Sequence, residues 1–558
     1  MNSLRGMLIW GAAAACLALS PACSAEQGTT PEADPVVNAP AGSVKGTAEG
    51  AIQVFKGIPY AQPPIGALRW KPPAAMAPWQ GVKDATAFGP ACLQPSSRRA
   101  LESHNVYASE PLPQSEDCLT LNIWAPAHAS KAPVLVWIHG GALWSGSSRE
   151  AMYDGTKLAA QGVIVVSINY RLGVLGWLAL PALSAESPLG VSGNYGLLDE
   201  IEALKWVKAN IASFGGDPAN VTIDGQSAGG LSVMYLMASP PARGLFAKAI
   251  SQSGYMISTY DLKRRAYGWP SGEDSGSLFA ATVHAPDLAA LRAMDGSTLT
   301  EAAAAAHFGP LGVVDGKILP HQLVEVFDKG EQAPVPLMAG FNSGELRSMR
   351  MLTPAVPGSA AKYESIIRER YGDLADAFLR LYPASNMEES ILATTRDALY
   401  GWTAERMVRK QAALGQPSYL YIFDHGYPAM DDVKLHGFHA SELPYLFGTF
   451  DGTPPYWPKI PASPRETRLS DAIIGYWTSF MRTGRPQAAG EPDWPAFGTK
   501  GAYMAFEDVP HPSQDLFPGM YKLDEEIVCR RRVSGDQPWN WNSGIAAPKL
   551  PPPSPQCK

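Results

Sequence analysis

Residues 225–229, with the sequence Gly-Gln-Ser-Ala-Gly, constrain the local fold more than any other segment of the chain. Residues 220–224 before them have the composition of a short buried strand, and residues 230–237 after them have that of a helix. A serine between two glycines at a strand-to-helix turn is the pattern of a nucleophile elbow, because the turn is too tight for side chains on both flanks. The pattern predicts that Ser227 is lifted out of a sheet, above the free N–H groups of the new helix. A string this short also arises by chance, so its meaning depends on residues elsewhere.

Strand-like and helix-like segments alternate over most of the chain. Residues 197–214 carry apolar side chains at intervals of three and four, which predicts an amphipathic helix. This alternation predicts an α/β fold with a large, mostly parallel central sheet and helices on both faces. Ligands of such sheets bind at the carboxyl ends of the strands, where the serine turn lies. Further buried strands are predicted at 134–138, 163–168, 247–251, 336–340 and 419–423, with a polar helix at 153–161.

The chain has 558 residues and no break in composition that would divide it, so we expect a single domain over residues 41–545. Residues 255–310 and 345–415 have weak, helix-rich patterns and are predicted to be insertions that cap the top of the sheet. Residues 546–558 are rich in proline and are expected to form an irregular C-terminal tail.

The N-terminus has the pattern of a signal peptide over residues 1–25. Arg5 supplies the positive charge, residues 7–19 form a short apolar stretch, and small residues precede Glu26. The apolar stretch is too short to span a bilayer comfortably, so we expect export to the periplasm or medium, and no integral membrane segment in the mature chain. Lipid anchoring at Cys23 is a less favoured alternative, because the residues before it fit such a site poorly. Residues 26–40 are expected to form a flexible leader.

Removal of the signal peptide leaves four cysteines, which allow three pairings. The pairing of neighbours in sequence is the expected one, and each bridge closes a loop worth roughly 3 kcal/mol. No cluster of cysteine and histidine with metal-ligand spacing is present in the sequence, so no metal site is predicted. The two expected bridges are Cys92–Cys118 and Cys529–Cys557.

The formal net charge of −7 leaves no basic face, so nucleic acid is not an expected partner. Nothing in the sequence points to a large assembly, and we expect a monomer or a weak homodimer.

A serine needs an adjacent base, usually histidine, to remove its proton. In this sheet topology the partners follow in the order nucleophile, acid, base. Residue patterns alone do not separate His436 from His439. An acid is suggested at Glu345, which follows a predicted strand at its carboxyl end, although a solvated loop carboxylate has the same pattern. The C-terminal candidates for the base are His425, His436, His439 and His511.

Residues 139–142, His-Gly-Gly-Ala, follow a predicted buried strand. A loop in this position supplies backbone donors to the oxyanion of a reacting carbonyl group, and its glycines allow close approach. The predicted donors are the N–H groups of Gly141, Ala142 and Ala228. A plain glycine-rich turn is the alternative.

Two long segments resemble the signatures of the type-B carboxylesterases, a family of α/β-hydrolases. Residues 214–229 (FGGDPANVTIDGQSAG) resemble the serine signature, and residues 116–124 (EDCLTLNIW) resemble the second. The resemblance covers roughly residues 36–527, and it implies an α/β-hydrolase fold with helical insertions capping the active site.

The resemblance also implies roles for particular residues. The family's acid lies in a Gly-x-Asn-x-x-Glu segment, which here ends at Glu345. Its histidine precedes x-x-Glu and a Pro-Tyr-x-Phe-Gly run, which selects His439. The family pattern further implies the Cys92–Cys118 bridge, with Ser253 and Glu442 supporting the triad. The implied reaction runs through an acyl-enzyme on Ser227 and needs no metal or organic cofactor.

Three departures from the family pattern bear on the site. Ala142 replaces a third glycine, and Leu346 stands where glycine often follows the acid. Residues 93–117 contain no tryptophan and Gln226 precedes the serine, so a cholinesterase is not expected. Arg98 and Arg99 hint weakly at an acidic substrate, although a solvated basic pair is the favoured interpretation.

The sequence therefore predicts an exported serine carboxylesterase with a small-molecule ester substrate. An amidase or an acyltransferase with the same triad is the alternative within the same chemistry. A non-enzymatic, cholinesterase-like interaction domain is disfavoured, because all three catalytic residue types are present.

Overall fold

The computed structural model describes residues 34–96, 104–540 and 543–557. The expected signal peptide, the first part of the leader, Cys23, Arg98 and Arg99 lie outside these residues. Among the described residues, none of the helices has both the length and the apolar character needed to cross a membrane.

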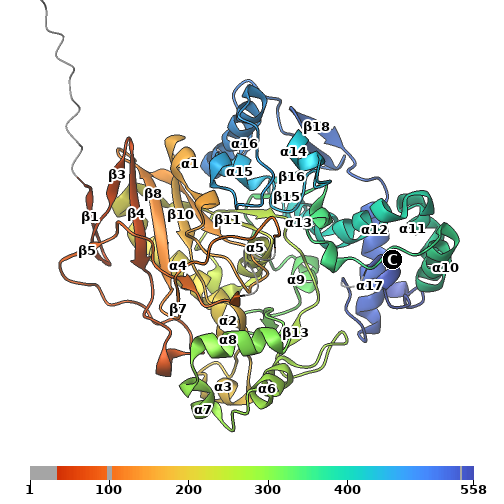
Figure 1. Ribbon diagram of the computed structural model, residues 1–558, viewed down its shortest axis with the longest axis horizontal. Helices are drawn as coiled ribbons and strands as arrows, with labels where there is room; N and C mark the ends of the chain where they lie inside the picture. Colours follow the sequence, from red (N-terminus) through yellow and green to blue (C-terminus); the bar gives the residue numbers. More distant parts are fainter. Residues whose placement is uncertain (1–33, 97–103, 541–542, 558) are drawn as a thin grey trace, which may run out of the picture. The chain divides into compact units, whose positions relative to one another are not determined.

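An eleven-stranded sheet organises the fold (Figure 1). Pairing is parallel at every step from β10 to β17, and antiparallel where β8, β4, β3 and β18 are added at the two sides. The predicted mostly parallel sheet is confirmed, while the antiparallel strands carry no distinctive pattern and were not predicted. In spatial order the strands are β18 (Pro510–Gln514), β17 (Ala502–Phe506), β16 (Ser418–Phe423), β15 (Leu337–Asn342), β12 (Lys248–Gln252), β11 (Gly216–Gln226), β9 (Ala132–Ile138), β10 (Ile164–Ile168), β8 (Thr120–Pro126), β4 (Ile52–Pro59) and β3 (Thr47–Glu49).

The central strands are apolar on both faces because helices cover both faces. Along β9, Val134 and Val136 pack into the cluster that contains α4 (Tyr195–Asn210) and α5 (Ala228–Ala238). The alternate residues, such as Leu135, pack into a second cluster with helices on the opposite face. Those helices are α1 (Thr156–Ala160), α15 (Leu443–Phe447) and α16 (Pro464–Thr483).

Two predicted helices differ in their bounds. The helix expected at 197–214 is α4 followed by a 3-10 turn, Ile211–Phe214, and it stops at Gly215, whose φ of 85° ends the helical run. The helix expected at 153–161 is the shorter α1, because Ala151–Tyr153 form a separate 3-10 turn before it.

The insertions contribute two groups of helices (Figure 1). Figure 1 shows α6, α7 and α8 grouped with α3, and α10, α11 and α12 grouped with α17. The last helix of the second insertion, α13, instead packs on β15 and β16 as part of the layer that flanks the sheet. The bounds are α3 (Pro181–Glu186), α6 (Gly272–Thr282), α7 (Leu288–Ala293), α8 (Gly296–Ala305), α10 (Ala360–Tyr371), α11 (Ala375–Leu381), α12 (Met387–Arg396), α13 (Trp402–Ala413) and α17 (Met520–Ser534).

The remaining elements are short. The boundary of the leader expected at residue 40 falls within regular structure, because β1 pairs with β2 and β2 pairs with β5. These elements are β1 (Val36–Ala39), β2 (Gly42–Lys45), β5 (Val82–Asp84), β6 (Ala91–Cys92), β7 (Gln114–Ser115), β13 (Tyr260–Asp261), β14 (Val313–Val314), α2 (Gly173–Trp177), α9 (Leu323–Lys329) and α14 (Pro428–Asp431).

Both expected disulfides are present, Cys92–Cys118 and Cys529–Cys557. The second joins α17 to the proline-rich tail. Within the tail, the Leu550 N–H donates to the Arg370 carbonyl at 2.7 Å, so the tail is also held by a backbone hydrogen bond.

Candidate active site

Ser227 occupies a tight turn between β11, which ends at Gln226, and α5, which begins at Ala228. Its backbone has φ 60° and ψ −119°, a conformation that a residue with a side chain rarely adopts. The Ser227 N–H donates to the Gln252 carbonyl at 2.9 Å, which attaches the turn to the end of β12. The side chain is partly exposed at the carboxyl end of the sheet, as the elbow pattern predicts.

The two glycines that flank the serine allow strands and helix to meet at this turn. A Cβ atom on Gly229 would lie 2.0 Å from the carbonyl oxygen of Ile138, the last residue of β9. A Cβ on Gly225 would lie 2.5 Å from the carbonyl carbon of Gly229. Only glycine fits at both positions without a shift of the backbone.

Glu345 and His439 are in direct contact. The Nδ1 atom of His439 forms a very short hydrogen bond with Oε2 of Glu345, and both side chains are buried. The other carboxylate oxygen of Glu345 accepts from the Asn342 N–H at 2.8 Å. A backbone hydrogen bond of 2.9 Å from Gly344 to Gly437 joins the two loops that carry the pair. The structure therefore brings the predicted acid to His439.

The other candidate histidines have different partners. His425 is buried and contacts Glu466 at 2.7 Å. His436 lies 2.8 Å from Asp431 and 3.2 Å from Asp424, and these hydrogen bonds to carboxylates, that to Asp424 foremost, raise its pKa to about 9. His511 lies on β18 with an exposed side chain.

The second ring nitrogen of His439 contacts the residue before the serine. The side-chain nitrogen of Gln226 lies 3.2 Å from Nε2 of His439. Within the part of the chain that the structure describes, the Ser227 hydroxyl forms no hydrogen bond. Catalytic hydrogen bonds are often long or misaligned before substrate binds, so this geometry is compatible with a role for Ser227 as nucleophile.

The loop at the end of β9 curls next to the serine. Gly141 has a φ of 109° and Ala142 one of 58°, and the N–H groups of Trp144 and Ser145 both donate to the Gly141 carbonyl at 3.0 Å. A Cβ on Gly140 would lie 3.1 Å from the Cβ of Ser227, so the loop passes directly beside it.

This geometry leaves backbone donors available at the serine. Among the described residues, the N–H groups of Gly141 and Ala142 have no hydrogen-bond partner. The N–H of Ala228 is the first of α5 and belongs to the unpaired amides of the helix N-terminus. Ala142 itself is exposed, and its left-handed backbone costs an alanine roughly 1 kcal/mol relative to a right-handed one.

Two residues expected to support the triad lie beneath it. Glu442 accepts a short hydrogen bond from the Asn342 side chain, the same residue whose backbone binds Glu345. Burial, with a further contribution from the charge of Glu345, raises the pKa of Glu442 to about 7. Ser253 has a φ of 46°, its N–H donates to Gly340 at 2.8 Å, and its hydroxyl is buried without a partner among the described residues.

Three residues at the site were not identified from the sequence. Asn342 links Glu345 to Glu442, and the Tyr107 hydroxyl donates to the His439 carbonyl at 2.8 Å. Tyr400 lies on a π-helical turn, Asp397–Gly401, with its ring centroid 5.4 Å from that of His439. The Asn342 position could have been inferred from the Gly-x-Asn-x-x-Glu segment, whereas no local pattern marks either tyrosine.

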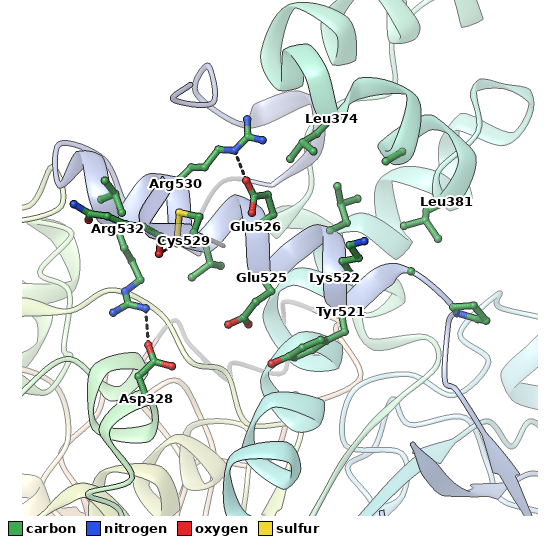
Figure 2. A pocket seen from close by; sticks show the side chains of 18 of the residues that line it. Asp328, Leu374, Leu381, Tyr521, Lys522, Glu525, Glu526, Cys529, Arg530 and Arg532 are labelled. Atoms are coloured by element: carbon green, nitrogen blue, oxygen red, sulfur yellow. Dashed lines mark hydrogen bonds and ion pairs between the residues drawn. A yellow bond between two sulfur atoms is a disulfide. The ribbon is translucent and has the colours of Figure 1, made fainter. Parts of the chain in front are cut away.

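A separate groove of about 1420 Å³ lies along α17 (Figure 2). Its lining contains Cys529 and Cys557 but none of the residues predicted to take part in chemistry. Figure 2 shows charged side chains of the groove paired with each other, including Arg532 with Asp328 at 2.7 Å. No set of three or more potential metal ligands is found among the described residues.

Comparison with known proteins gives consistent matches over most of the chain. The profile of the carboxylesterase family matches residues 33–517. The chain is 35% identical over 490 residues to fumonisin B1 esterase of Sphingopyxis macrogoltabida, covering 83% of this chain and 85% of that protein. It is 39% identical over 473 residues to para-nitrobenzyl esterase of Bacillus subtilis strain 168, covering 83% of this chain and 92% of that protein.

Solved structures match equally broadly. A PNB esterase superposes with a TM-score of 0.74 at 33% identity, covering 88% of this chain and 99% of the other. A carboxylesterase of Geobacillus stearothermophilus superposes with a TM-score of 0.68 at 31% identity and the same coverage of 88% and 99%.

Proposed function

This chain belongs to the carboxylesterase family and is a carboxylic ester hydrolase with the α/β-hydrolase fold, and from that premise we propose that Ser227, His439 and Glu345 are its catalytic triad. The observation that carries the proposal is the buried contact between Nδ1 of His439 and Glu345, made beside a serine in a strained turn. The substrate is a small-molecule ester. The substrates named for the relatives differ, so the proposal does not extend to a particular ester.

In the proposed reaction, Ser227 Oγ attacks the ester carbonyl carbon while its proton passes to Nε2 of His439. Glu345 accepts the Nδ1–H hydrogen bond, which keeps the ring in the tautomer that leaves Nε2 free to accept and stabilises the imidazolium that forms. Collapse of the tetrahedral intermediate breaks the bond to the alcohol oxygen, which takes the proton from Nε2. Water then attacks the acyl-enzyme by the same steps and releases the acid.

The negative charge on the carbonyl oxygen needs donors that are already in place. We assign this role to the N–H groups of Gly141, Ala142 and Ala228, which lie next to the serine without protein partners among the described residues. Loss of one such donor typically costs roughly 3 kcal/mol of transition-state stabilisation. The loop that carries Gly141 and Ala142 has positive φ at both residues and passes directly beside Ser227.

We further propose that residues 1–25 direct export and that residues 41–545 form one catalytic domain. Two disulfides support an oxidising compartment, because such bonds rarely persist in the reducing cytosol. The proposal places the enzyme in the periplasm or outside the cell.

The triad is tested with Ser227→Ala and His439→Gln on a short-chain p-nitrophenyl ester. We expect kcat to fall by about four orders of magnitude or more in each, because both groups act as one unit in the same step. His511→Gln, which changes an exposed histidine on β18, is the matched control and is expected to retain wild-type kinetics. Thermal unfolding of each variant checks that the fold is intact. Hydrolysis that survives Ser227→Ala would exclude the proposed nucleophile.

A further inference from the structure

The side chain of Gln226 lies between two parts of the proposed site. Its nitrogen is 3.2 Å from Nε2 of His439. Its oxygen lies on the side of the oxyanion loop, 3.2 Å from the point that a Cβ on Gly140 would occupy. Gln226 is only 3% exposed, so this amide is part of the packed floor beside Ser227. Burial therefore restricts the movement of this amide.

The tautomer of His439 decides which atom donates and which accepts in the contact with Gln226. A neutral imidazole has one donor nitrogen and one acceptor nitrogen. Because the Glu345 carboxylate accepts at Nδ1, that nitrogen carries the proton and Nε2 is the acceptor. The Gln226 N–H therefore donates to Nε2. A hydrogen bond of this kind favours the neutral ring and opposes its conversion to imidazolium.

The same nitrogen is the one that must take the proton of Ser227. In the structure Gln226 occupies it, and the Ser227 hydroxyl makes no hydrogen bond to any described residue. An N–H donor at this position suits the unprotonated Nε2, whereas the imidazolium that forms during the reaction needs an acceptor there. An amide offers both functions and carries no charge. A carboxylate offers only the acceptor, and an aliphatic side chain offers neither.

We propose that Gln226 is a positioning residue that donates to Nε2 of His439 in the resting enzyme, holds the ring beside Ser227, and yields this nitrogen to the Ser227 hydroxyl during the reaction. This inference rests on the proposed triad and deepens it. It assigns to Gln226 a function in setting the pH range of the esterase, in addition to its place in the turn. The titratable groups that face His439 from other directions are Glu345, Glu442 and Tyr400, and the variants tested below leave all three unchanged.

The test is the pH dependence of kcat/KM with an uncharged p-nitrophenyl ester. In Gln226→Glu, the new carboxylate attracts the imidazolium, so the midpoint of the acid limb is expected to rise by about one pH unit or more. In Gln226→Met, which removes the donor and adds no charge, a smaller rise is expected together with a several-fold loss of kcat. Gln161→Glu makes the same change of charge at an exposed position after α1 and is expected to leave the profile unchanged.

Each result bears on one proposal. A folded, active Gln226→Glu enzyme whose acid limb coincides with that of the wild type would overturn the inference. If that variant does not fold, a Gln226→Met enzyme with a wild-type profile and kcat overturns it instead. Adding Ser227→Ala to either background separates the two proposals: residual hydrolysis there contradicts the triad, whereas an unmoved pH profile contradicts only the role of Gln226.

Discussion

Asp224 places a carboxyl group in the layer of side chains beneath the serine turn. Its neighbour across the sheet is Trp137, and the side chain is fully buried. One oxygen accepts from the Gln252 side chain at 2.9 Å, and the other has no hydrogen-bond partner among the described residues. Burial, increased by the nearby charge of Glu442, raises the pKa of Asp224 to about 8. Asp224 is therefore mainly protonated at neutral pH.

This pKa predicts how stability depends on pH. An unfolded aspartate has a pKa of about 3.9. Between about pH 4 and pH 8, the folded protein therefore binds more protons at Asp224 than the unfolded chain does. The free energy of unfolding contributed by Asp224 therefore falls as pH rises through this range. Asp224→Asn keeps the acceptor for Gln252 and removes the titration. We expect the variant to be more stable than the wild type at pH 9, by a difference on the order of 5 kcal/mol.

The measurement is urea unfolding of both proteins at pH 5, 7 and 9. Other buried acids titrate in both proteins, so the difference between the two reports the titration of Asp224 together with its interaction with Glu442. The difference should shrink toward pH 5, where the wild-type carboxyl is protonated. Equal stabilities at pH 9 would mean that Asp224 is not held protonated by the fold.

At the scale of elements, the serine turn lies where the ends of the neighbouring strands β9 and β11 meet the first turn of α5. Every residue of α5 is buried, so the helix is held by packing on all sides and not by an amphipathic face. Its second residue, Gly229, lies against the end of β9, and the backbones of the two elements are in contact there. The position of the proposed nucleophile, Ser227, therefore depends on this close approach.

Gly229→Ala tests that dependence. Its Cβ would meet the Ile138 carbonyl oxygen at 2.0 Å, and because this contact is with backbone it is relieved only by moving α5 or β9. We expect a loss of stability on the order of 3 kcal/mol, with a large fall in kcat because Ser227 moves with the helix. Denaturant unfolding and ester kinetics measure the two effects.

Gly358→Ala is the matched control for this change. A Cβ on Gly358 would have no atom within 4 Å, so the same substitution should be nearly neutral there. A Gly229→Ala enzyme with wild-type stability and kcat would show that the contact between α5 and the end of β9 tolerates a side chain.

At the scale of the whole described chain, the helices α10, α11 and α17 and the C-terminal tail form a hydrophobic cluster of their own, here called the C-terminal part. The cluster combines side chains of α10, α11 and α17 with Leu550 of the tail, and the Cys529–Cys557 bridge joins the tail to α17. The lining of the groove in Figure 2 includes both cysteines. None of these residues belongs to the proposed active site.

Replacement of both cysteines of this bridge by serine should therefore separate stability from activity. The bridge closes a loop with a sequence separation of 28 residues, and its removal is expected to cost about 3 kcal/mol. We expect a lower Tm with kcat and KM unchanged. The measurements are calorimetry and ester kinetics on the double variant.

The Cys92–Cys118 bridge, unlike Cys529–Cys557, is connected to the proposed active site. Gln94 donates to the Cys92 carbonyl and to the Gly146 carbonyl, both at 3.1 Å, which connects the first disulfide to the loop of the proposed oxyanion donors. Removal of Cys92–Cys118 should therefore lower kcat as well as Tm. A fall in kcat on removing Cys529–Cys557 would contradict the separation of the C-terminal part from the site.

Local patterns were sufficient for the parts of the fold that are local in sequence. The strand, turn and helix around Ser227 were predicted, because apolar composition and the two glycines act over a few residues. The mostly parallel sheet was predicted from the alternation of strand-like and helix-like segments along the chain. The antiparallel strands β8 and β4 were missed, since their pairing is set by partners far along the chain.

By itself, the sequence determined the strand-turn-helix at Ser227, the mostly parallel sheet and the short list of possible partners for Ser227. From residue patterns alone, four histidines remained open, and only the resemblance to a family narrowed them to His439. The tertiary structure decided which side chains meet: Glu345 with His439, 94 positions apart, and Gln226 with His439, 213 positions apart. It also decided that Asp224 is buried beside Glu442. The physical reason is that periodicity records which face of an element is apolar, whereas contacts between loops depend on how whole strands are ordered and packed.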